Sequence, residues 1–337
     1  IKNRKAIKMK KGFVVVLLAL VLTAFAIVPA FADGDYTIAV VPKLTSIAWF
    51  QRMEVGVKEY AEETGVDAFY TGPSEGDGAL QAQFIEDLIA QGVDAICVVP
   101  FSTEALEPVL KKAREAGILV ISHEASGMEN IDYDIEAFNN EAYGEHFMAR
   151  LGELMDGKGE YLLEVGGLTS ESHMQWTEAA IQYQKANFPD MKLAADRIET
   201  KDDQTISYEK VKEALTANPN IMGVQGSAMP DVAGAALAVQ ELGLSGKVQI
   251  VGTSLVSVSG KYIKEGTIDT IGFWDPALAG KAMIQLAVNI LDGKEVTDGL
   301  DLGIEGYDKL TLDGKVLYGQ AWIDVNKDNV DDPAYDF

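Results

Sequence analysis

Short runs of β-branched and other apolar residues alternate along this chain with longer segments in which apolar residues recur every three to four positions. The short runs predict buried strands, and the longer segments predict amphipathic helices, several of which end at a glycine. In the first half we expect strands at 36–41, 66–70, 94–99 and 118–122, and helices at 49–64, 79–90 and 103–116. This regular alternation of strand and helix predicts a parallel sheet with right-handed crossovers.

The same pattern then restarts. Helices are predicted at 141–155, 172–187, 208–216, 231–242, 256–265 and 276–291. Strands are predicted at 160–165, 193–199, 221–225, 248–252 and 267–273, followed by an alternating segment, 309–325, with a hairpin signal at Asp313-Gly314. The predicted fold class is therefore α/β, with two doubly wound parallel-sheet lobes that enclose a crevice.

The first 32 residues differ in character from the rest. Every basic residue before position 33 lies in the first eleven, and an apolar run, Phe13–Val28, leads to the small-residue site Pro29–Ala32. This arrangement predicts a signal peptide, 1–32, although a membrane anchor is the alternative. Without those 32 residues, 305 remain (337 − 32), and the net charge falls from −24 to −30 because six cations are lost. No Cys lies near the cleavage site, so we expect a secreted or periplasmic protein without a lipid anchor.

Composition narrows the function classes. The chain has 52 acidic and 28 basic side chains, and this excess argues against nucleic-acid binding, which requires clustered Lys and Arg. The single cysteine, Cys97, excludes an intramolecular disulfide framework and a zinc ribbon. We expect a monomer.

Ligands of open α/β sheets bind beyond the carboxyl ends of the strands, so the residues after each predicted strand are the candidates for a site. Aromatic faces stack on sugar rings, and carboxylates, amides and amines hold hydroxyl groups. The predicted ligand-binding residues are Lys43, Trp49, Phe50, His123, Glu124, Ser172, His173, Gln225, Gly226, Thr253, Trp274 and Asp275.

Several of these residues also have a structural interpretation. Trp49 and Phe50 begin a helix, so one of them is expected to face the core. Asp275 precedes Pro276 and has the sequence of a helix N-cap. Lys43 is either a ligand-binding donor or a surface cation, whereas Trp176 and His146 are expected to be structural.

No motif predicts catalysis, a cofactor or a metal. His123-Glu124 lacks the second histidine that a zinc protease needs, and neither a nucleophile elbow nor a phosphate loop occurs. The segment Asp324–Asp331 has calcium-loop spacing at three positions, but it lacks the glycine and the terminal glutamate. We interpret it as a solvated tail.

The chain resembles the sugar-type, ribose-binding-like periplasmic solute-binding proteins of ABC importers. Within them it looks closest to the autoinducer-2 and rhamnose receptor branch. The resemblance extends over the whole chain after the signal peptide, and these segments carry it: Ile38–Phe50, Tyr70–Glu75, Ala90–Ala95, Ala113–Ser122, Phe273–Gly280 and Asn326–Phe337.

Position by position, Lys43 matches the lysine of that family, and Glu124 stands where the family has an aspartate. His123, the pair Ser172-His173 and the segment Val224–Gly226 differ from the autoinducer-2 receptors. The resemblance therefore implies the fold and a transport role but leaves the ligand open.

The resemblance implies two lobes joined by three crossings. We expect an N-terminal lobe of 36–130 plus 275–305, and a C-terminal lobe with a tail, 131–274 plus 306–337. The crossings are expected near Ala125–Phe138, Trp274–Asp275 and Gly303–Lys309.

The implied function is capture of a small sugar-like ligand by hinge closure, followed by delivery to an ABC permease in the membrane. Stacking would fall to Trp49, Phe50 and Trp274. Lys43 and Gln225 would donate hydrogen bonds to the ligand, and Glu124 and Asp275 would accept them from its hydroxyl groups. His123 and His173 would complete the polar shell around the ligand. The alternatives are a receptor for autoinducer-2 or one coupled to a chemoreceptor or sensor, and, from another class, an exported glycoside hydrolase using Glu124 and His173.

Overall fold

The computed structural model describes residues 36–337. The predicted signal peptide, 1–32, lies outside the described residues. Among residues 36–337, no helix is both long and apolar enough to cross a membrane.

The first sheet has the strand order β12-β13-β5-β4-β3-β1-β2. Its strands are β1 (Thr37–Val41), β2 (Asp67–Tyr70), β3 (Ala95–Val98), β4 (Leu119–Ser122), β5 (Tyr133–Glu136), β12 (Thr311–Asp313) and β13 (Val316–Tyr318). All neighbours are parallel except the hairpin pair β12 and β13. β2 lies on one side of β1 and β3 lies on the other. The order of strands therefore reverses direction at β1.

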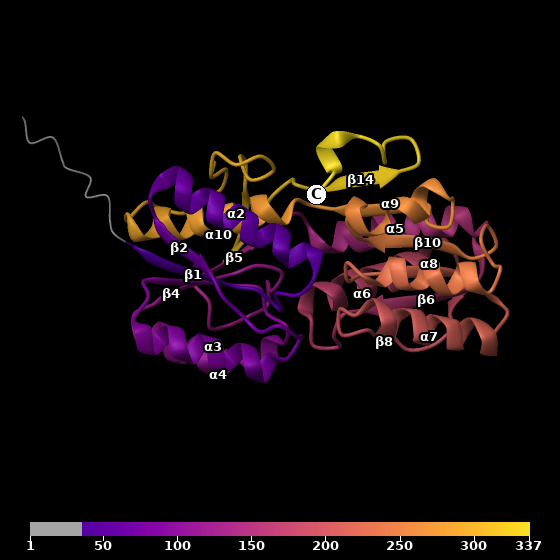
Figure 1. The fold of residues 1–337 in the computed structure, drawn as a ribbon, viewed down its shortest axis with the longest axis horizontal. Coiled ribbons are helices and arrows are strands. Elements are labelled where there is room, and N and C mark those ends of the chain that lie inside the picture. Colours follow the sequence, from indigo (N-terminus) through magenta and orange to yellow (C-terminus); the bar gives the residue numbers. More distant parts are fainter. Residues whose placement is uncertain (1–35) are drawn as a thin grey trace, which may run out of the picture. The chain divides into compact units, whose positions relative to one another are not determined.

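Helices cover both faces of this sheet because both faces are apolar (Figure 1). Along β1, Ile38 and Val40 join the core on one face, and Ala39 and Val41 join a separate core on the other. The helices are α2 (Ala48–Thr64) and α10 (Pro276–Leu291) on the first face, and α3 (Gly78–Gln91) and α4 (Thr103–Glu115) on the second. Burial of alternate residues on opposite faces explains why the strands read as continuous apolar runs.

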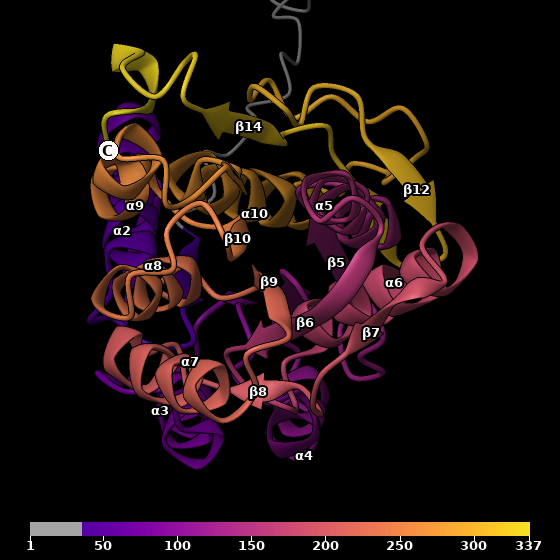
Figure 2. The same cartoon turned by 90° about the vertical axis from the view of Figure 1, so that its right-hand side faces the viewer.

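The second sheet repeats this plan in the order β14-β11-β10-β9-β6-β7, with β8 paired to β6. Its strands are β6 (Lys158–Val165), β7 (Asp190–Leu193), β8 (Ile198–Glu199), β9 (Ile221–Gly226), β10 (Gln249–Thr253), β11 (Thr270–Phe273) and the antiparallel β14 (Ile323–Asn326). Figure 2 shows α5 (Asn140–Leu154) and α6 (Glu171–Asn187) on one side of the sheet and α7 (Gln204–Ala217) and α8 (Asp231–Glu241) on the other. A shorter helix, α9 (Val256–Lys264), follows β10, and a short 3₁₀ helix, Pro333–Tyr335, ends the chain.

Local sequence signals set the helix ends. Asp77 caps α3 by accepting hydrogen bonds from the backbone N–H groups of Ala79 and Leu80. Helices α2 and α3 end at Gly65 and Gly92, which adopt left-handed backbone conformations with φ of 77° and 71°. These are the glycines at which the sequence predicts the helices to stop.

The prediction of an α/β fold with two parallel-sheet lobes is confirmed. The bounds of the predicted strand 193–199 are wrong, because β7 ends at Leu193 and only the two residues of β8 lie inside the rest of that range. The predicted hairpin at Asp313-Gly314 joins β12 to β13. One strand was missed. Residues 133–136 read Tyr-Asp-Ile-Glu, and two buried acids, Asp134 and Glu136, hide this strand from a pattern based on apolar residues.

The missed strand corrects the expected lobe boundaries. β5 belongs to the first sheet, and β13 pairs with β5 there, so residues 133–136 and 311–318 belong to the first lobe rather than the second. The first crossing therefore follows β5, at 137–139, and the third follows β13, at 319–322. The expected third crossing, Gly303–Lys309, lies instead in the loop before β12. The second passage between lobes is at Trp274–Asp275, between β11 and α10.

The three crossings contact one another. The backbone N–H groups of Gly319 and Ala321 donate to the carbonyls of Glu136 and Ala137, so the first and third crossings run side by side. Each crossing also carries an aromatic residue. The ring of Phe138 lies 5.1 Å from that of Trp274 and 5.8 Å from that of Trp322. Motion at one crossing must therefore repack the other two.

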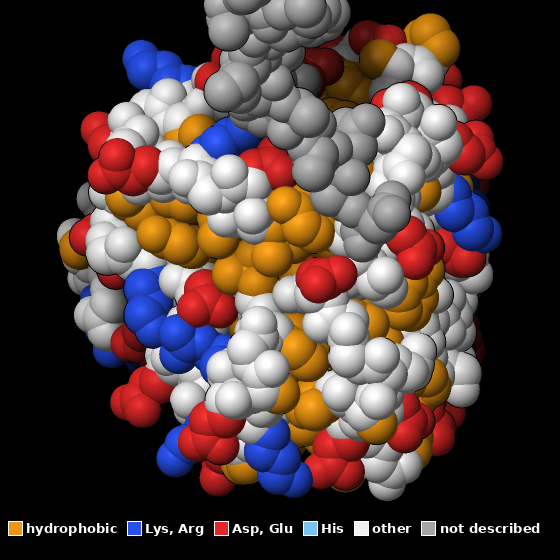
Figure 3. All heavy atoms as spheres, turned by 90° about the vertical axis from the view of Figure 1, so that its left-hand side faces the viewer, with side chains coloured by type: hydrophobic (Ala, Val, Ile, Leu, Met, Phe, Trp, Pro, Cys, Tyr) orange, Lys and Arg blue, Asp and Glu red, His pale blue; other side chains and the backbone are white. Residues whose placement is uncertain are grey.

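Few large apolar side chains of the described residues are mainly exposed. Figure 3 shows the end of the first lobe, where charged side chains of both signs surround a central apolar band. Among the described residues, the large apolar side chains that are mainly exposed are Val55, Leu168 and Leu237, which lie on three separate elements. These three residues therefore do not form one exposed patch.

The second lobe contains a buried acid without hydrogen-bond partners. Glu164, at the end of β6, is completely buried, and neither of its carboxyl oxygens has a hydrogen-bond partner. Burial raises the pKa of Glu164 well above its usual value, and the nearby Asp231 raises it further. Burial likewise raises the pKa of Asp231 to about 7.

We expect stability to fall as the pH rises through neutrality. A carboxyl group whose pKa is higher in the folded state stabilises the fold below its unfolded-state pKa, and this contribution is lost as pH rises through the folded-state pKa. The free energy of unfolding should therefore decrease between pH 5 and pH 8, and Glu164→Gln should remove about 1–3 kcal/mol of that decrease. Urea denaturation at both pH values measures it. Exposed Glu209→Gln is the control, and an unchanged pH dependence in Glu164→Gln would contradict the assignment.

Candidate functional site

The carboxyl ends of the central strands of both sheets meet at a small cavity between the lobes. Its volume is about 20 Å³, enough for a single water molecule. The residues that line it are Lys43, Ile47, Trp49, Phe50, Glu124, His173, Trp176, Asp202, Ser227, Ala228, Met229, Thr253 and Trp274. Seven of the twelve predicted ligand-binding residues are among them: Lys43, Trp49, Phe50, Glu124, His173, Thr253 and Trp274.

A buried ion pair lies at the centre of this arrangement. Lys43, after β1, and Glu124, after β4, are 3.0 Å apart, and their side chains are only 3% and 4% exposed. Two serines of the second lobe complete the pair. The Lys43 ammonium donates to the Ser170 hydroxyl at 3.3 Å, and the Ser172 hydroxyl donates to the Glu124 carboxylate at 2.9 Å. The ion pair of one lobe is therefore hydrogen-bonded by the other.

The ion pair determines the charge of Glu124. Burial is the largest single influence and would raise the pKa of Glu124, but the adjacent Lys43 ammonium, together with His123 and His173, outweighs burial and lowers this pKa to about 2. Glu124 also has a left-handed backbone, with φ of 61°. Such strain costs on the order of 1 kcal/mol and typically persists at functional sites.

The two predicted histidines have different roles. His173 lines the cavity, and its Nδ1 accepts a hydrogen bond from the Gly166 backbone at 3.0 Å, so its proton is on Nε2. Burial lowers the pKa of His173 well below its usual value, and the nearby Lys43 lowers it further. His173 is therefore a neutral donor.

His123 is a connecting residue rather than a cavity residue. Its Nδ1 donates to the Ile135 carbonyl, and its Nε2 accepts from the Trp274 indole at 3.1 Å. Both nitrogens are thus occupied, and burial lowers the pKa of His123. The prediction that His123 contributes to the polar shell of the ligand is not supported by this geometry, because His123 joins β4 to β5 and to the second crossing.

Aromatic rings form much of the cavity wall. Trp49, Phe50, Trp176 and Trp274 all line it, and the rings of Trp49 and Trp274 meet edge to face at 4.6 Å. The Trp176 indole donates to Asn140. In contrast, the Trp49 indole N–H and the Ser227 hydroxyl are both buried without a hydrogen-bond partner. Unsatisfied buried polar groups are costly unless something pairs with them.

Four further predicted residues lie close to the cavity but do not line it. Ser172 donates its hydrogen bond to Glu124. Gln225 is buried, and its Oε1 has no hydrogen-bond partner. A Cβ on Gly226 would come within 2.7 Å of Asp231, so this glycine allows close packing of α8. Asp275 is paired bidentately with Arg52, at 2.8 and 2.6 Å, and it caps α10 through the Ala277 N–H. The N-cap interpretation of Asp275 is therefore correct, and its proposed contact with ligand hydroxyls is not supported.

Sequence reasoning missed Asp202, and Trp176 was expected to be only a core residue. Asp202 follows β8, a two-residue strand concealed within the longer strand predicted at 193–199. The predicted strand also ends at Glu199, so Asp202 lay just after a predicted strand, but the residues after this strand were not among the candidates. Met229 and Ala228 belong to the loop after β9, beyond the positions considered there.

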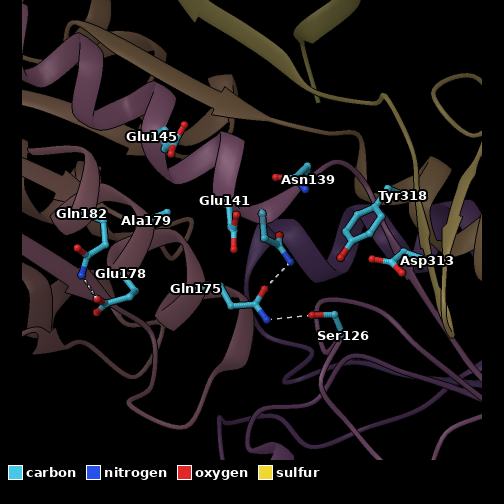
Figure 4. Close-up of a pocket in the computed structure, with 11 residues that line it drawn as sticks. Ser126, Asn139, Glu141, Glu145, Gln175, Glu178, Ala179, Gln182, Asp313 and Tyr318 are labelled. Carbon is cyan, nitrogen blue, oxygen red and sulfur yellow. Dashed lines mark hydrogen bonds between the residues drawn. The ribbon is translucent and has the colours of Figure 1, made fainter. Parts of the chain in front are cut away.

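A larger groove lies outside this cavity (Figure 4). It has a volume of about 580 Å³ and is bordered by α5, α6 and the β12–β13 hairpin. In it, Gln175 of the second lobe donates to Ser126 of the first at 2.9 Å. The carboxylates along it are Glu141, Glu145, Glu178 and Asp313. None of the predicted ligand-binding residues lines this groove.

The two members of the ion pair are expected to be strongly coupled. Lys43→Met leaves the Glu124 charge buried and alone, which should cost about 3–5 kcal/mol of unfolding free energy. Lys43→Met combined with Glu124→Gln should recover most of this loss, because no unpaired charge remains. Urea denaturation of the single and double variants measures the coupling. Lys112→Met, which breaks the exposed pair with Glu86, is the control and should cost less than about 1 kcal/mol. Additive losses would refute the coupling.

Comparison with known proteins places this arrangement in a family. A model of the periplasmic binding protein domain matches residues 38–295. The chain is 28% identical to the D-xylose-binding periplasmic protein of Escherichia coli, with 84% of each chain covered. It is 29% identical to the D-ribose/D-allose-binding protein of Pseudomonas aeruginosa, over 82% of this chain and 91% of the relative.

Solved structures share the fold. The LsrB protein from Clostridium saccharobutylicum in complex with AI-2 matches with a TM-score of 0.81 at 23% identity. The match covers 89% of this chain and 100% of the LsrB chain. An ABC transporter solute-binding protein from Clostridium phytofermentas with bound L-rhamnose has a TM-score of 0.82 at 21% identity, with 89% and 98% covered. The two-lobed fold and the extent of the family match together establish that this chain belongs to the periplasmic binding protein family.

Proposed function

We propose that this protein captures a small polyhydroxylated ligand, such as a sugar, between its two lobes and delivers it to an ABC permease. The observation that carries this proposal is the cavity at the strand ends, where aromatic walls surround buried polar groups that lack protein partners. Hydroxyl groups both donate and accept hydrogen bonds, so one such ligand suits the Trp49 indole, the Ser227 hydroxyl and the Asp202 carboxylate together.

The proposed mechanism is opening and closing of the lobes about the three crossings. The cavity of about 20 Å³ is far smaller than a sugar ring, so the lobes must separate for a ligand to enter. Separation breaks the bonds of Lys43 to Ser170 and of Glu124 to Ser172, which are made between lobes. Closure around a ligand restores polar contacts at the same place.

The relatives support the ligand class but not one ligand. They include proteins named for binding D-xylose, D-ribose and D-allose, and solved structures with AI-2 or L-rhamnose bound. An autoinducer-2 receptor is thus an alternative within the same fold. A role coupled to a chemoreceptor or sensor uses the same ligand site and differs only in the partner of the closed form. We propose a monomer that is exported from the cytoplasm, and the predicted signal peptide and the periplasmic family support the proposed export.

A glycoside hydrolase is a weaker alternative, and we propose that the protein is not an enzyme. The mechanism requires a carboxylic acid that is protonated near neutral pH. The pKa of Glu124 is lowered to about 2, because Lys43 and the two nearby histidines together outweigh burial, and this carboxylate cannot act as that acid. Lys43 is close to the Ser170 hydroxyl but is held in an ion pair, so it is not a free base for that serine.

A thermal-shift screen tests the proposed function. The panel contains D-xylose, D-ribose, D-allose, L-rhamnose, xylitol and autoinducer-2, and at least one should raise the melting temperature by mass action. For each ligand that binds, Lys43→Ala and Glu124→Ala should each weaken binding by about 1–3 kcal/mol, measured by calorimetry.

Lys112→Ala removes an exposed lysine and should leave the affinity unchanged. If no polyhydroxylated compound raises the melting temperature, the proposed function is wrong. If a ligand binds but both cavity variants retain full affinity, the site is elsewhere. Turnover of a glycoside that is lost on Glu124→Gln would favour the hydrolase instead.

A further inference from the structure

Asp202 presents an unusual carboxylate to the cavity. It lines the cavity wall and is only 6% exposed. Within residues 36–337, no donor is hydrogen-bonded to its carboxylate, and burial is the main cause that raises its pKa. Its neighbour in the second lobe, Asp231, differs because it accepts from the Thr200 hydroxyl and from two backbone N–H groups.

The backbone around Asp202 is arranged to hold the carboxylate there. Lys201 and Asp202 are consecutive residues in left-handed conformations, with φ of 57° and 55°. Such conformations are uncommon for residues other than glycine, although Asp tolerates them better than most. Facing Asp202 is Gly166, where a Cβ would come within 2.6 Å of the carboxylate oxygen Oδ1. A missing side chain and a strained turn together create the space that Asp202 occupies.

The charges around the cavity do not balance. Lys43 and Glu124 neutralise each other at 3.0 Å, and His173 is neutral because Nδ1 accepts from Gly166. Asp202 adds a second carboxylate to this wall. Lys43, the one lysine that lines it, is near enough to lower the pKa of Asp202 but is already paired with Glu124. A buried carboxylate without a partner is costly, and a cation supplied by the ligand would offset that cost.

The rest of the wall suits a cation that also carries apolar C–H faces. Trp49, Phe50, Trp176 and Trp274 surround the same cavity. The faces of aromatic rings attract ammonium groups as well as the C–H faces of sugar rings. Trp49 and His173 add N–H donors for hydroxyl oxygens.

From this charge balance we infer that the preferred ligand is a hydroxylated amine, an amino sugar or aminocyclitol, whose ammonium group is bound by Asp202. This inference rests on the proposed function and specifies its ligand. Lys43 and Glu124 then hold hydroxyl groups, and Asp202 distinguishes an amine from a hydroxyl at one position of the ring. A neutral sugar leaves the Asp202 charge without a counter-ion, so it should bind more weakly.

Matched pairs of ligands provide the test. Calorimetry compares D-glucosamine with D-glucose, D-galactosamine with D-galactose, and an amino-deoxy-inositol with myo-inositol. In at least one pair the amine should bind about 10- to 100-fold more tightly than the hydroxyl compound, as expected for a hydrogen bond between charged groups. Asp202→Asn, which keeps the shape and tolerates the left-handed backbone, should abolish this preference while retaining affinity for the neutral member.

Asp196→Asn, an exposed carboxylate of the same lobe, is the matched control and should leave the preference intact. Circular dichroism and the melting temperature of the Asp202→Asn variant show whether it folds. If neutral members bind as tightly as the amines, or if Asp202→Asn leaves the preference unchanged, this inference is overturned and the proposed function stands. If no compound of any pair and no neutral sugar binds, both are overturned.

Discussion

The buried ion pair between Lys43 and Glu124 is the interaction on which the other features of the site depend. Two charges that are nearly inaccessible to water are tolerated only when they are paired and hydrogen-bonded. Both residues belong to the first lobe, but Ser170 and Ser172, which complete the hydrogen bonding, belong to the second. The pair is therefore fully satisfied only when the lobes are together, and this couples the chemistry of the cavity to closure.

The scaffold supplies this coupling through its connections. Trp274 lines the cavity, lies in the second crossing and packs against Phe138 of the first. Its indole also donates to His123, next to Glu124 in the chain. A ligand that displaces Trp274 or Glu124 thus acts directly on the segments about which the lobes rotate. His123, predicted as a ligand-binding residue, instead links the cavity to the hinge.

Much of the site was predictable because parallel strands align their carboxyl ends at one edge of a sheet. Lys43, Glu124, His173 and Trp274 were all found in this way. Asp202 was not found, although the predicted strand 193–199 ends three residues before it, because nothing local marks this carboxylate as one that faces the cavity. Asp275 was misassigned because a carboxylate before a helix caps that helix as readily as it binds a ligand. Its partner, Arg52, is more than two hundred residues away, and no local pattern reveals it.

By itself, the sequence determined the periodic elements and therefore the fold, because apolar periodicity and glycine stops are local properties. It also determined which strand ends carry polar and aromatic residues. Only the tertiary structure decided to which sheet β5 belongs, because the buried acids Asp134 and Glu136 interrupt its apolar pattern and its pairing with β13 joins segments far apart in the chain. Only the tertiary structure showed which buried carboxylates are paired, and that Asp202 in the cavity wall and Glu164 in the second lobe are not. Pairing depends on distances across the fold, and the order of residues along the chain does not contain those distances.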